Sequence, residues 1–146
     1  MYWLDVRDCP ATFWAFCDHF ANRAAASFEG KLDRFDLLSI PGAASAQTVT
    51  LLRQHAQQDD FVVVPVTTST IGELKRRLAG PRVFGAHGDI DHAQLSGEGG
   101  LLFSACDHFH RECVRATDLV PVGLLDSLVA AGLVRSYQVI PDRTHL

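Results

Sequence analysis

The chain lacks the features that identify several large classes of protein. Its 146 residues contain no apolar run near the roughly 20 residues that a membrane-spanning helix needs. The N-terminal segment MYWLDVRDCP has neither the basic stretch nor the apolar run of a secretory signal, so we expect a cytoplasmic protein with no membrane partner. Phosphate-binding loops, dinucleotide-binding fingerprints and G-x-S-x-G elbows are also missing.

Positive charge is scarce as well. Lys and Arg together number 13 against 17 Asp and Glu, which gives a formal net charge of −4. Binding to nucleic acid depends on neutralising phosphates, and the chain offers no broad basic surface, so we expect no nucleic-acid partner. Hydrophobic residues make up 47% of the chain and charged residues 21%, a balance typical of one globular domain, here residues 1–146.

Cysteine is limited to four positions, Cys9, Cys17, Cys106 and Cys113. Their spacing contains no C-x-x-C pair, and a cytoplasmic chain of this length folds without disulfides, so we expect reduced thiols. Two of them begin a repeated string, CDHF, at residues 17–20 and 106–109. The first copy falls in a predicted helix and the second at the end of a predicted strand, so we interpret the repeat as a coincidence.

Hydrophobic periodicity predicts an α+β fold. Apolar residues at every second position indicate strands, and apolar residues with a period of 3.6 indicate helices. Gly and Pro mark the boundaries between these elements. The predicted elements are strands at 2–7, 34–42, 61–66 and 133–140, helices at 8–30, 45–60, 70–79 and 121–131, and a hairpin within 82–108. We expect a mixed β-sheet with about four helices packed on it, the hairpin in its C-terminal half, and a frayed tail at 141–146.

Reactive side chains concentrate between residues 87 and 113, around the predicted hairpin. The glycines of SGEGG permit a tight loop, which brings the two ends of the hairpin together. With Leu95 opposite Leu101, Asp89 would face Asp107 across the ladder. This neighbourhood is the predicted location of any functional site.

One hypothesis for this region is a metal site. The string HGDIDH resembles the H-x-H-x-D-H signature of metallo-β-lactamase-type hydrolases, with Asp89 in place of the middle histidine. The resemblance implies bound metal and a metal-activated water, although the fold of those enzymes needs a longer chain with further histidines. The candidate ligands, with zinc as the metal, are His87, Asp89, Asp91, His92, Cys106, His108 and His110.

A second hypothesis is a cysteine nucleophile. Cys106 or Cys113 would be activated by His108 or His110 as the base. Nothing in the sequence marks the oxyanion hole that such a site requires. Free cysteines in an apolar strand such as LLFSAC also pack commonly as small hydrophobic residues.

The incomplete catalytic set favours a binding protein over an enzyme. Its carboxylates would form an acidic surface that steers a cationic partner toward it. The predicted binding residues are Asp59, Asp60, Asp89, Asp91, Glu98 and Asp107.

A small acidic α+β domain resembles, in general character, the immunity proteins that neutralise bacterial toxins. We therefore expect a non-enzymatic module without a cofactor that binds another, basic protein, and an immunity- or antitoxin-like inhibitor is the specific form of this hypothesis. A hydrolase that uses a metal ion or a cysteine in the 87–113 region is the alternative. The sequence does not specify the oligomeric state.

Overall fold

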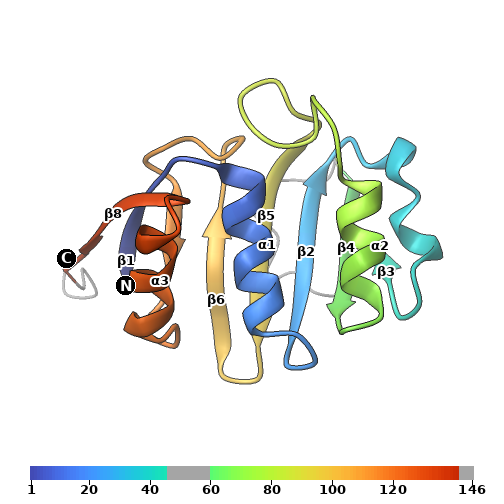
Figure 1. The fold of residues 1–146 in the computed structure, drawn as a ribbon. Coiled ribbons are helices and arrows are strands. Elements are labelled where there is room, and N and C mark those ends of the chain that lie inside the picture. The colour runs from blue at the N-terminus through green and yellow to red at the C-terminus, as the bar shows by residue number, and fades with distance from the viewer. Residues whose placement is uncertain (46–59, 142–146) are drawn as a thin grey trace.

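The computed structural model describes residues 1–45 and 60–141 (Figure 1). The strands are β1 (Tyr2–Val6), β2 (Ala24–Gly30), β3 (Ala44–Ser45), β4 (Asp60–Val66), β5 (Ile90–Gly97), β6 (Gly100–Ala105), β7 (Val114–Ala116) and β8 (Val134–Val139). The α-helices are α1 (Cys9–His19), α2 (Thr70–Arg77) and α3 (Val122–Ala130), and two short 3-10 helices are η1 (Asp33–Phe35) and η2 (Leu37–Ser39).

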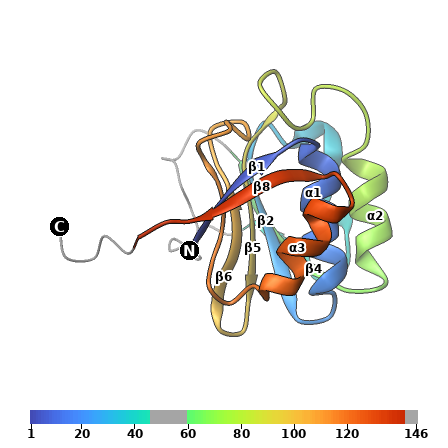
Figure 2. The ribbon, with the colours of Figure 1, turned by 60° about the vertical axis from the view of Figure 1, so that its left-hand side comes forward.

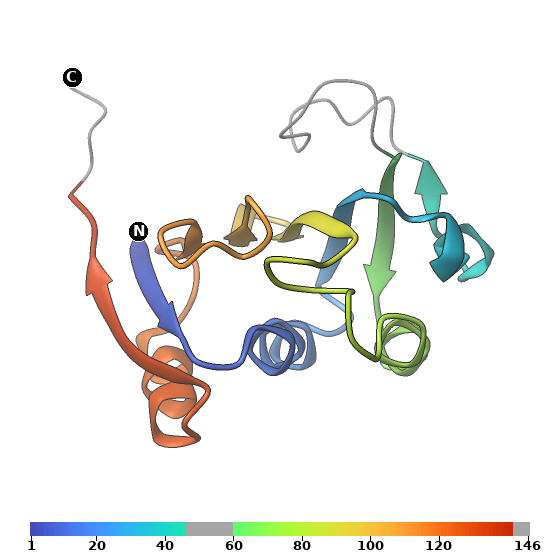
Figure 3. The same cartoon turned by 90° about the horizontal axis from the view of Figure 1, so that it is seen from above.

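The described strands form a single sheet in the order β3-β4-β2-β5-β6-β7-β1-β8. All of their pairings are antiparallel, whereas a mixed sheet was expected. The three described α-helices lie on the same side of the sheet, as the turned views show (Figure 2; Figure 3). The α+β class is therefore correct. The described residues hold three α-helices against about four predicted, and residues 46–59 of the helix predicted at 45–60 lie outside the described residues.

Helix α1 begins where Asp8 caps it and ends well before the predicted Gly30. The Asp8 carboxylate accepts a hydrogen bond from the backbone N–H of Ala11 at 3.1 Å, and Pro10 occupies the first turn. The chain then turns at Asn22, whose φ is 69°. Phe20, at the end of the helix, is buried, so the first CDHF copy does lie on a buried helical stripe.

Strand β2 replaces the second half of the predicted first helix. Alanine favours helices, and it misled the prediction at AAASFEG, but tertiary packing overrides this preference. Ala26 and Phe28 are fully buried on the side that faces α1, and the Phe13 ring of α1 meets the Phe28 ring edge-on at 5.7 Å. Ser27 and Glu29 point to the opposite side, because side chains alternate along a strand.

The aromatic core lies between the sheet and α1. The Phe13 ring also lies 5.8 Å from the Phe103 ring of β6, and the rings of Phe16 and Phe103 are 4.7 Å apart. These rings fix α1 above the centre of the sheet, over β2, β5 and β6.

Several other predictions of local structure differ from the structure. A strand was expected at 34–42, but this segment forms the 3-10 helices η1 and η2. The two helices meet at Asp36, whose φ is 51°. Strand β7 was not predicted. The hairpin strands β5 and β6 pair Leu95 with Phe103, not with Leu101, because the turn is tighter than expected and the register shifts after Leu95.

Helices α2 and α3 and strands β4 and β8 lie where the sequence predicts them. Ser69, the N-cap residue of α2, makes no side-chain capping hydrogen bond. The Thr70 hydroxyl donates to the Pro65 carbonyl at 2.6 Å, while Glu73 bonds Arg77 at 3.1 Å. Residues 142–146 of the expected tail lie outside the described residues.

Candidate functional site

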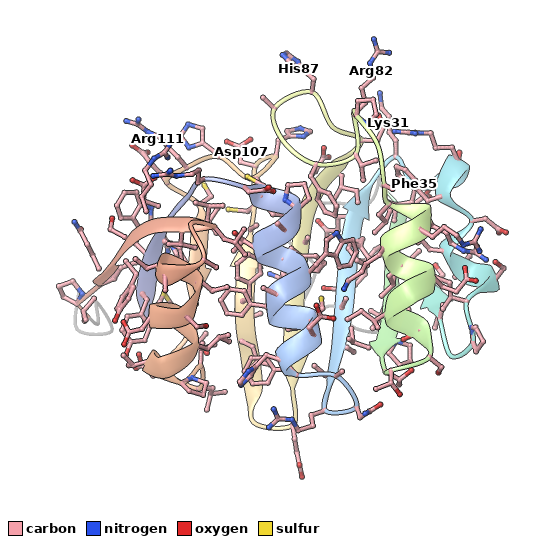
Figure 4. The ribbon with its side chains drawn as sticks, viewed as in Figure 1. Lys31, Phe35, Arg82, His87, Asp107 and Arg111 are labelled. Atoms are coloured by element: carbon pink, nitrogen blue, oxygen red, sulfur yellow. The ribbon has the colours of Figure 1, made fainter. Side chains whose placement is uncertain are left out.

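Three segments meet at one end of the sheet, where β2 and β6 finish and β5 begins. We call this surface, made of residues 31–34, 82–91 and 106–113, the loop end. Figure 4 shows Lys31, Arg82, His87, Asp107 and Arg111 along it. All five are exposed. The surface therefore combines charges of both signs.

The segment 82–89 is fastened to residues 31–34. The Arg34 guanidinium bonds the Asp89 carboxylate at 2.7 Å and the Arg82 carbonyl at 2.9 Å. The Lys31 N–H donates to the Asp89 carbonyl at 2.9 Å. One arginine thus holds both ends of the 82–89 segment, and the Asp89 charge is balanced within the chain.

Gly30 makes this approach possible. Its φ is 147°, and a Cβ at this position would lie 2.1 Å from the Asp89 carbonyl oxygen. A side chain would therefore displace the backbone of the 82–89 segment. Glycine is required here by close approach of two backbones and by its conformation.

The turn at 106–113 has an unusual backbone. Asp107, His108 and Phe109 have φ values of 48°, 56° and 60°, so three consecutive residues adopt the left-handed conformation. This conformation costs L-residues other than glycine roughly 1–2 kcal/mol each, although Asp accepts it more readily than most. Such strain persists only where the surroundings determine it, and it clusters at functional sites.

Long-range contacts hold this turn in place. The His108 N–H donates to the Asp91 carbonyl at 2.8 Å, and His108 Nε2 lies 2.9 Å from Asp91 Oδ1. The Asp107 N–H donates to His92 Nδ1 at 3.1 Å. Phe109 is buried, and its ring meets the Phe84 ring edge-on at 5.2 Å. The turn is therefore anchored to β5 and to the 82–89 segment at the same time.

The thiols of Cys106 and Cys113 lie side by side at the base of this turn. The Cys106 thiol is 3.8 Å from the Cys113 carbonyl oxygen. Burial raises the pKa of Cys106 to about 11, and the neighbouring Cys113 side chain contributes in the same direction. At neutral pH the Cys106 thiol is therefore protonated almost completely, and an activated nucleophile needs the opposite.

The predicted acidic binding residues do not all come together. Asp89, Asp91 and Asp107 belong to the loop end, and Asp60 begins β4 opposite Gly30 at the same end of the sheet. Glu98 lies in the β5–β6 turn, which is at the other end of both strands. Asp59 falls outside the described residues. Asp89 forms an ion pair with Arg34, so its charge is balanced within the chain.

Several of the predicted metal ligands are engaged with the protein itself. Asp89 bonds Arg34, Asp91 bonds His108, and His92 Nδ1 accepts a backbone N–H. His110 Nδ1 accepts the Glu112 N–H at 3.3 Å. Across residues 1–45 and 60–141, no three His, Cys, Asp or Glu side chains are grouped so that they could hold a metal ion.

A second polar region, which the sequence did not reveal, lies on the face of the sheet away from the described helices. Ser27, Glu29, His92 and Gln94 are all at most 4% exposed on this face. Ser27 pairs with Gln94 and Glu29 with His92 across β2 and β5. The Gln94 amide also lies 3.4 Å from the Ser104 hydroxyl of β6. These residues form polar rows across neighbouring strands.

This region was missed because residues 24–30 were assigned to a helix. The alternation of Ala26 and Phe28 with Ser27 and Glu29 is the signal that could have found it, since a period of two places polar residues on one face. Gln94 Oε1 is buried and accepts no hydrogen bond within the described part of the chain. The rows adjoin the loop end through His92.

The polar rows lead to the paired thiols. Glu29 lies opposite His92, and the pairing of Ala93 with Ala105 places Cys106 next to His92 across β5 and β6. An acid, an imidazole and a thiol thus follow one another across three strands. The Cys106 thiol nevertheless donates its hydrogen bond to the Cys113 carbonyl.

Within the described ranges, no helix has the length and apolar character needed to cross a membrane. Comparison with known proteins gives no match: no family model matches the chain, and neither a curated protein nor a solved structure does so.

Proposed function

We propose that the loop end is a protein-binding surface and that the chain acts as a binding module without enzymatic activity of its own. The observation that carries this proposal is the left-handed turn at Asp107–Phe109. This turn exposes Asp107 and is held by contacts from two other segments. Such a strained turn is preorganised, and preorganisation lowers the entropic cost of binding.

The charges that remain exposed at this end support recognition of a charged partner. Asp107 and Glu112 are exposed carboxylates on the 106–113 turn, while Lys31, Arg82 and Arg111 are exposed cations of the loop end. An immunity- or antitoxin-like inhibitor of a basic protein is the specific form of the proposal. In this form Asp107 and Glu112 would steer the partner, and the cations would reject partners of the wrong charge pattern.

An affinity capture experiment tests this proposal. The wild-type chain is compared with a double variant, Asp107→Asn with Glu112→Gln, which keeps the size of both side chains and removes their charges. Asparagine also accepts the left-handed conformation at position 107. The matched control is Glu98→Gln, which removes an exposed carboxylate from the opposite end of β5 and β6.

The proposal expects a partner that the wild type and the Glu98 variant retain, that the double variant loses, and whose capture weakens as salt rises. Equal capture by the double variant would contradict it. A partner lost only by the Glu98 variant would contradict it as well.

The alternative proposal is a hydrolase, and one observation favours it. Asp91 orients the imidazole of His108 through Nε2, and His108 Nδ1 is buried with no partner among the described residues. A carboxylate that orients a histidine is the arrangement of a general base. Metal analysis with and without chelator, and titration of the thiols with a neutral alkylating reagent, test this alternative. Stoichiometric zinc or one unusually fast cysteine would favour it over binding.

A further inference from the structure

Cys106 and Cys113 face each other where β6 and β7 meet the 106–113 turn. The ladder pairs Ala105 with Val114, so the next residue of each strand brings Cys106 opposite Cys113. The Cys106 N–H donates to the Cys113 carbonyl at 3.5 Å and continues the ladder. Opposite residues in an antiparallel pair point to the same face with Cα atoms about 4.5–5.5 Å apart, which suits a disulfide.

The turn already holds the two thiols together. The His110 N–H donates to the Asp107 carbonyl at 3.0 Å, and the Cys113 N–H donates to the His110 carbonyl at 2.7 Å. The Cys106 thiol lies 3.8 Å from the Cys113 carbonyl oxygen. The backbone pairing therefore already brings the two residues opposite each other with the sheet closed.

Cys106 and Cys113 are the two cysteines that are both partly accessible and adjacent to each other. Cys106 and Cys113 are both half-buried, whereas Cys17 is fully buried on the inner face of α1. Cys9 is half-buried, but it is the first residue of α1 and lies on another element. A small oxidant can reach the pair at the edge of the turn.

We propose that Cys106 and Cys113 are oxidised to an intramolecular disulfide that closes the 106–113 turn, with a low-molecular-weight disulfide such as oxidised glutathione as the oxidant. This modification does not depend on what the loop end binds. It makes the turn a redox-sensitive element, because the bond restricts the segment that carries Asp107 and His108.

The exchange proceeds in two balanced steps. One of the two cysteines loses its proton and attacks a sulfur of oxidised glutathione, which forms a mixed disulfide and releases one glutathione thiolate. The thiolate of the other cysteine then attacks the protein sulfur of the mixed disulfide and expels the second glutathione. Two protein thiols are oxidised, one glutathione disulfide is reduced to two glutathione thiols, and the two protons pass to these thiols.

Burial of Cys106 lowers the rate of this exchange at neutral pH. The raised pKa of Cys106 keeps the thiolate population low at neutral pH, so exchange is slow there and speeds up as the pH rises. The equilibrium position depends on the geometry of the pair and on the oxidant. It does not depend on this rate.

The test uses the full chain equilibrated in glutathione buffers with increasing shares of oxidised glutathione. The reaction is stopped with acid, and the remaining thiols are alkylated after unfolding and counted by intact mass. The four thiols of the reduced chain are expected to fall to two, with the loss of two hydrogens and no retained glutathione. Peptide mapping is expected to join Cys106 to Cys113.

Matched variants separate this bond from other oxidations. Cys106→Ser and Cys113→Ser are each expected to stop at a single mixed disulfide with glutathione. Cys9→Ser is expected to close the bond as the wild type does. If the wild type keeps both thiols in the most oxidising buffer, or if the bond joins Cys9 or two chains, the proposal is overturned.

Discussion

Asp91 holds His108 through its backbone and its side chain at once. The His108 N–H donates to the Asp91 carbonyl at 2.8 Å, and His108 Nε2 lies 2.9 Å from the Asp91 carboxylate. The first residues of β5 therefore fix a turn that follows the end of β6. The shape of the loop end depends on this contact between two segments, which local sequence alone does not supply.

Asp91→Asn should weaken this anchor moderately. The substitution keeps the backbone acceptor and replaces the carboxylate that contacts His108 Nε2 with a neutral amide, which is a weaker acceptor. Both side chains are partly exposed, so we expect a loss of about 1 kcal/mol or less in the free energy of unfolding. Urea unfolding measures the change, with Glu98→Gln as the control for loss of an exposed charge. An Asp91 variant as stable as that control would show that the side-chain contact contributes nothing.

The stability of variants at position 107 should depend on how readily the new residue adopts the left-handed backbone conformation. Asp107 is exposed with a φ of 48°, which glycine adopts freely and alanine does not. We expect Asp107→Gly to be more stable than Asp107→Ala by about 1 kcal/mol. Thermal unfolding of the two variants measures the difference. The opposite order of stability would mean that the left-handed turn does not persist in solution.

Gly30→Ala should be among the most disruptive single substitutions in the chain. Its Cβ would meet the Asp89 carbonyl oxygen at 2.1 Å, and both atoms belong to the backbone or are attached directly to it. We expect a loss of roughly 3 kcal/mol or more, in line with severe overpacking. The control is Gly123→Ala on α3, where a Cβ meets nothing within 4 Å, and which should gain up to about 1 kcal/mol from helix propensity.

Denaturant unfolding distinguishes the two glycine variants. If Gly30→Ala is as stable as the wild type while Gly123→Ala loses stability, the close contact between β2 and the 82–89 segment is contradicted.

The cysteines should react slowly and in a defined order. Burial raises the pKa of Cys17, and it raises that of Cys9 with help from the Asp8 carboxylate. Since the pKa of Cys106 is about 11, its alkylation rate should rise about tenfold for each pH unit between 7 and 9. Cys17 should react only after unfolding. A Cys106 that reacts rapidly and independently of pH near 7 would instead support the cysteine-hydrolase alternative.

Some of this fold follows from local sequence. Gly80 and Gly132 follow α2 and α3, and the valine run of β4 is a strand by composition and by period. The SGEGG loop indicates a turn, and β5 and β6 do flank it. In these cases local preference and tertiary packing favour the same structure, so the sequence pattern is sufficient to predict the element.

Other parts depend on contacts that local patterns do not encode. Residues 24–30 carry three alanines with high helix propensity, yet they form a central strand because α1 packs on one face of it. The hairpin register depends on a bulge after Leu95, and such a shift changes every pair beyond it. The left-handed turn at 107–109 depends on Asp91 and Phe84, which lie far from it in the sequence.

The sequence predicted the proximity of some candidate residues better than it predicted their contacts. The clustering of reactive residues at 87–113 indicated the correct end of the sheet for Asp89, Asp91 and Asp107. It did not indicate that Arg34 neutralises Asp89, because this arginine comes from a segment predicted as a strand. The polar rows through Glu29 and Gln94 could not be assigned until β2 was recognised as a strand.

Hydrogen–deuterium exchange of the chain with and without its captured partner tests the central claim most directly. If the loop end is the binding surface, added protection should be confined to residues 31–34, 82–91 and 106–113. Exchange in α3 and in the β5–β6 turn at 97–100 should not change. Protection of α3 or of that turn, with the loop end unaffected, would contradict the account.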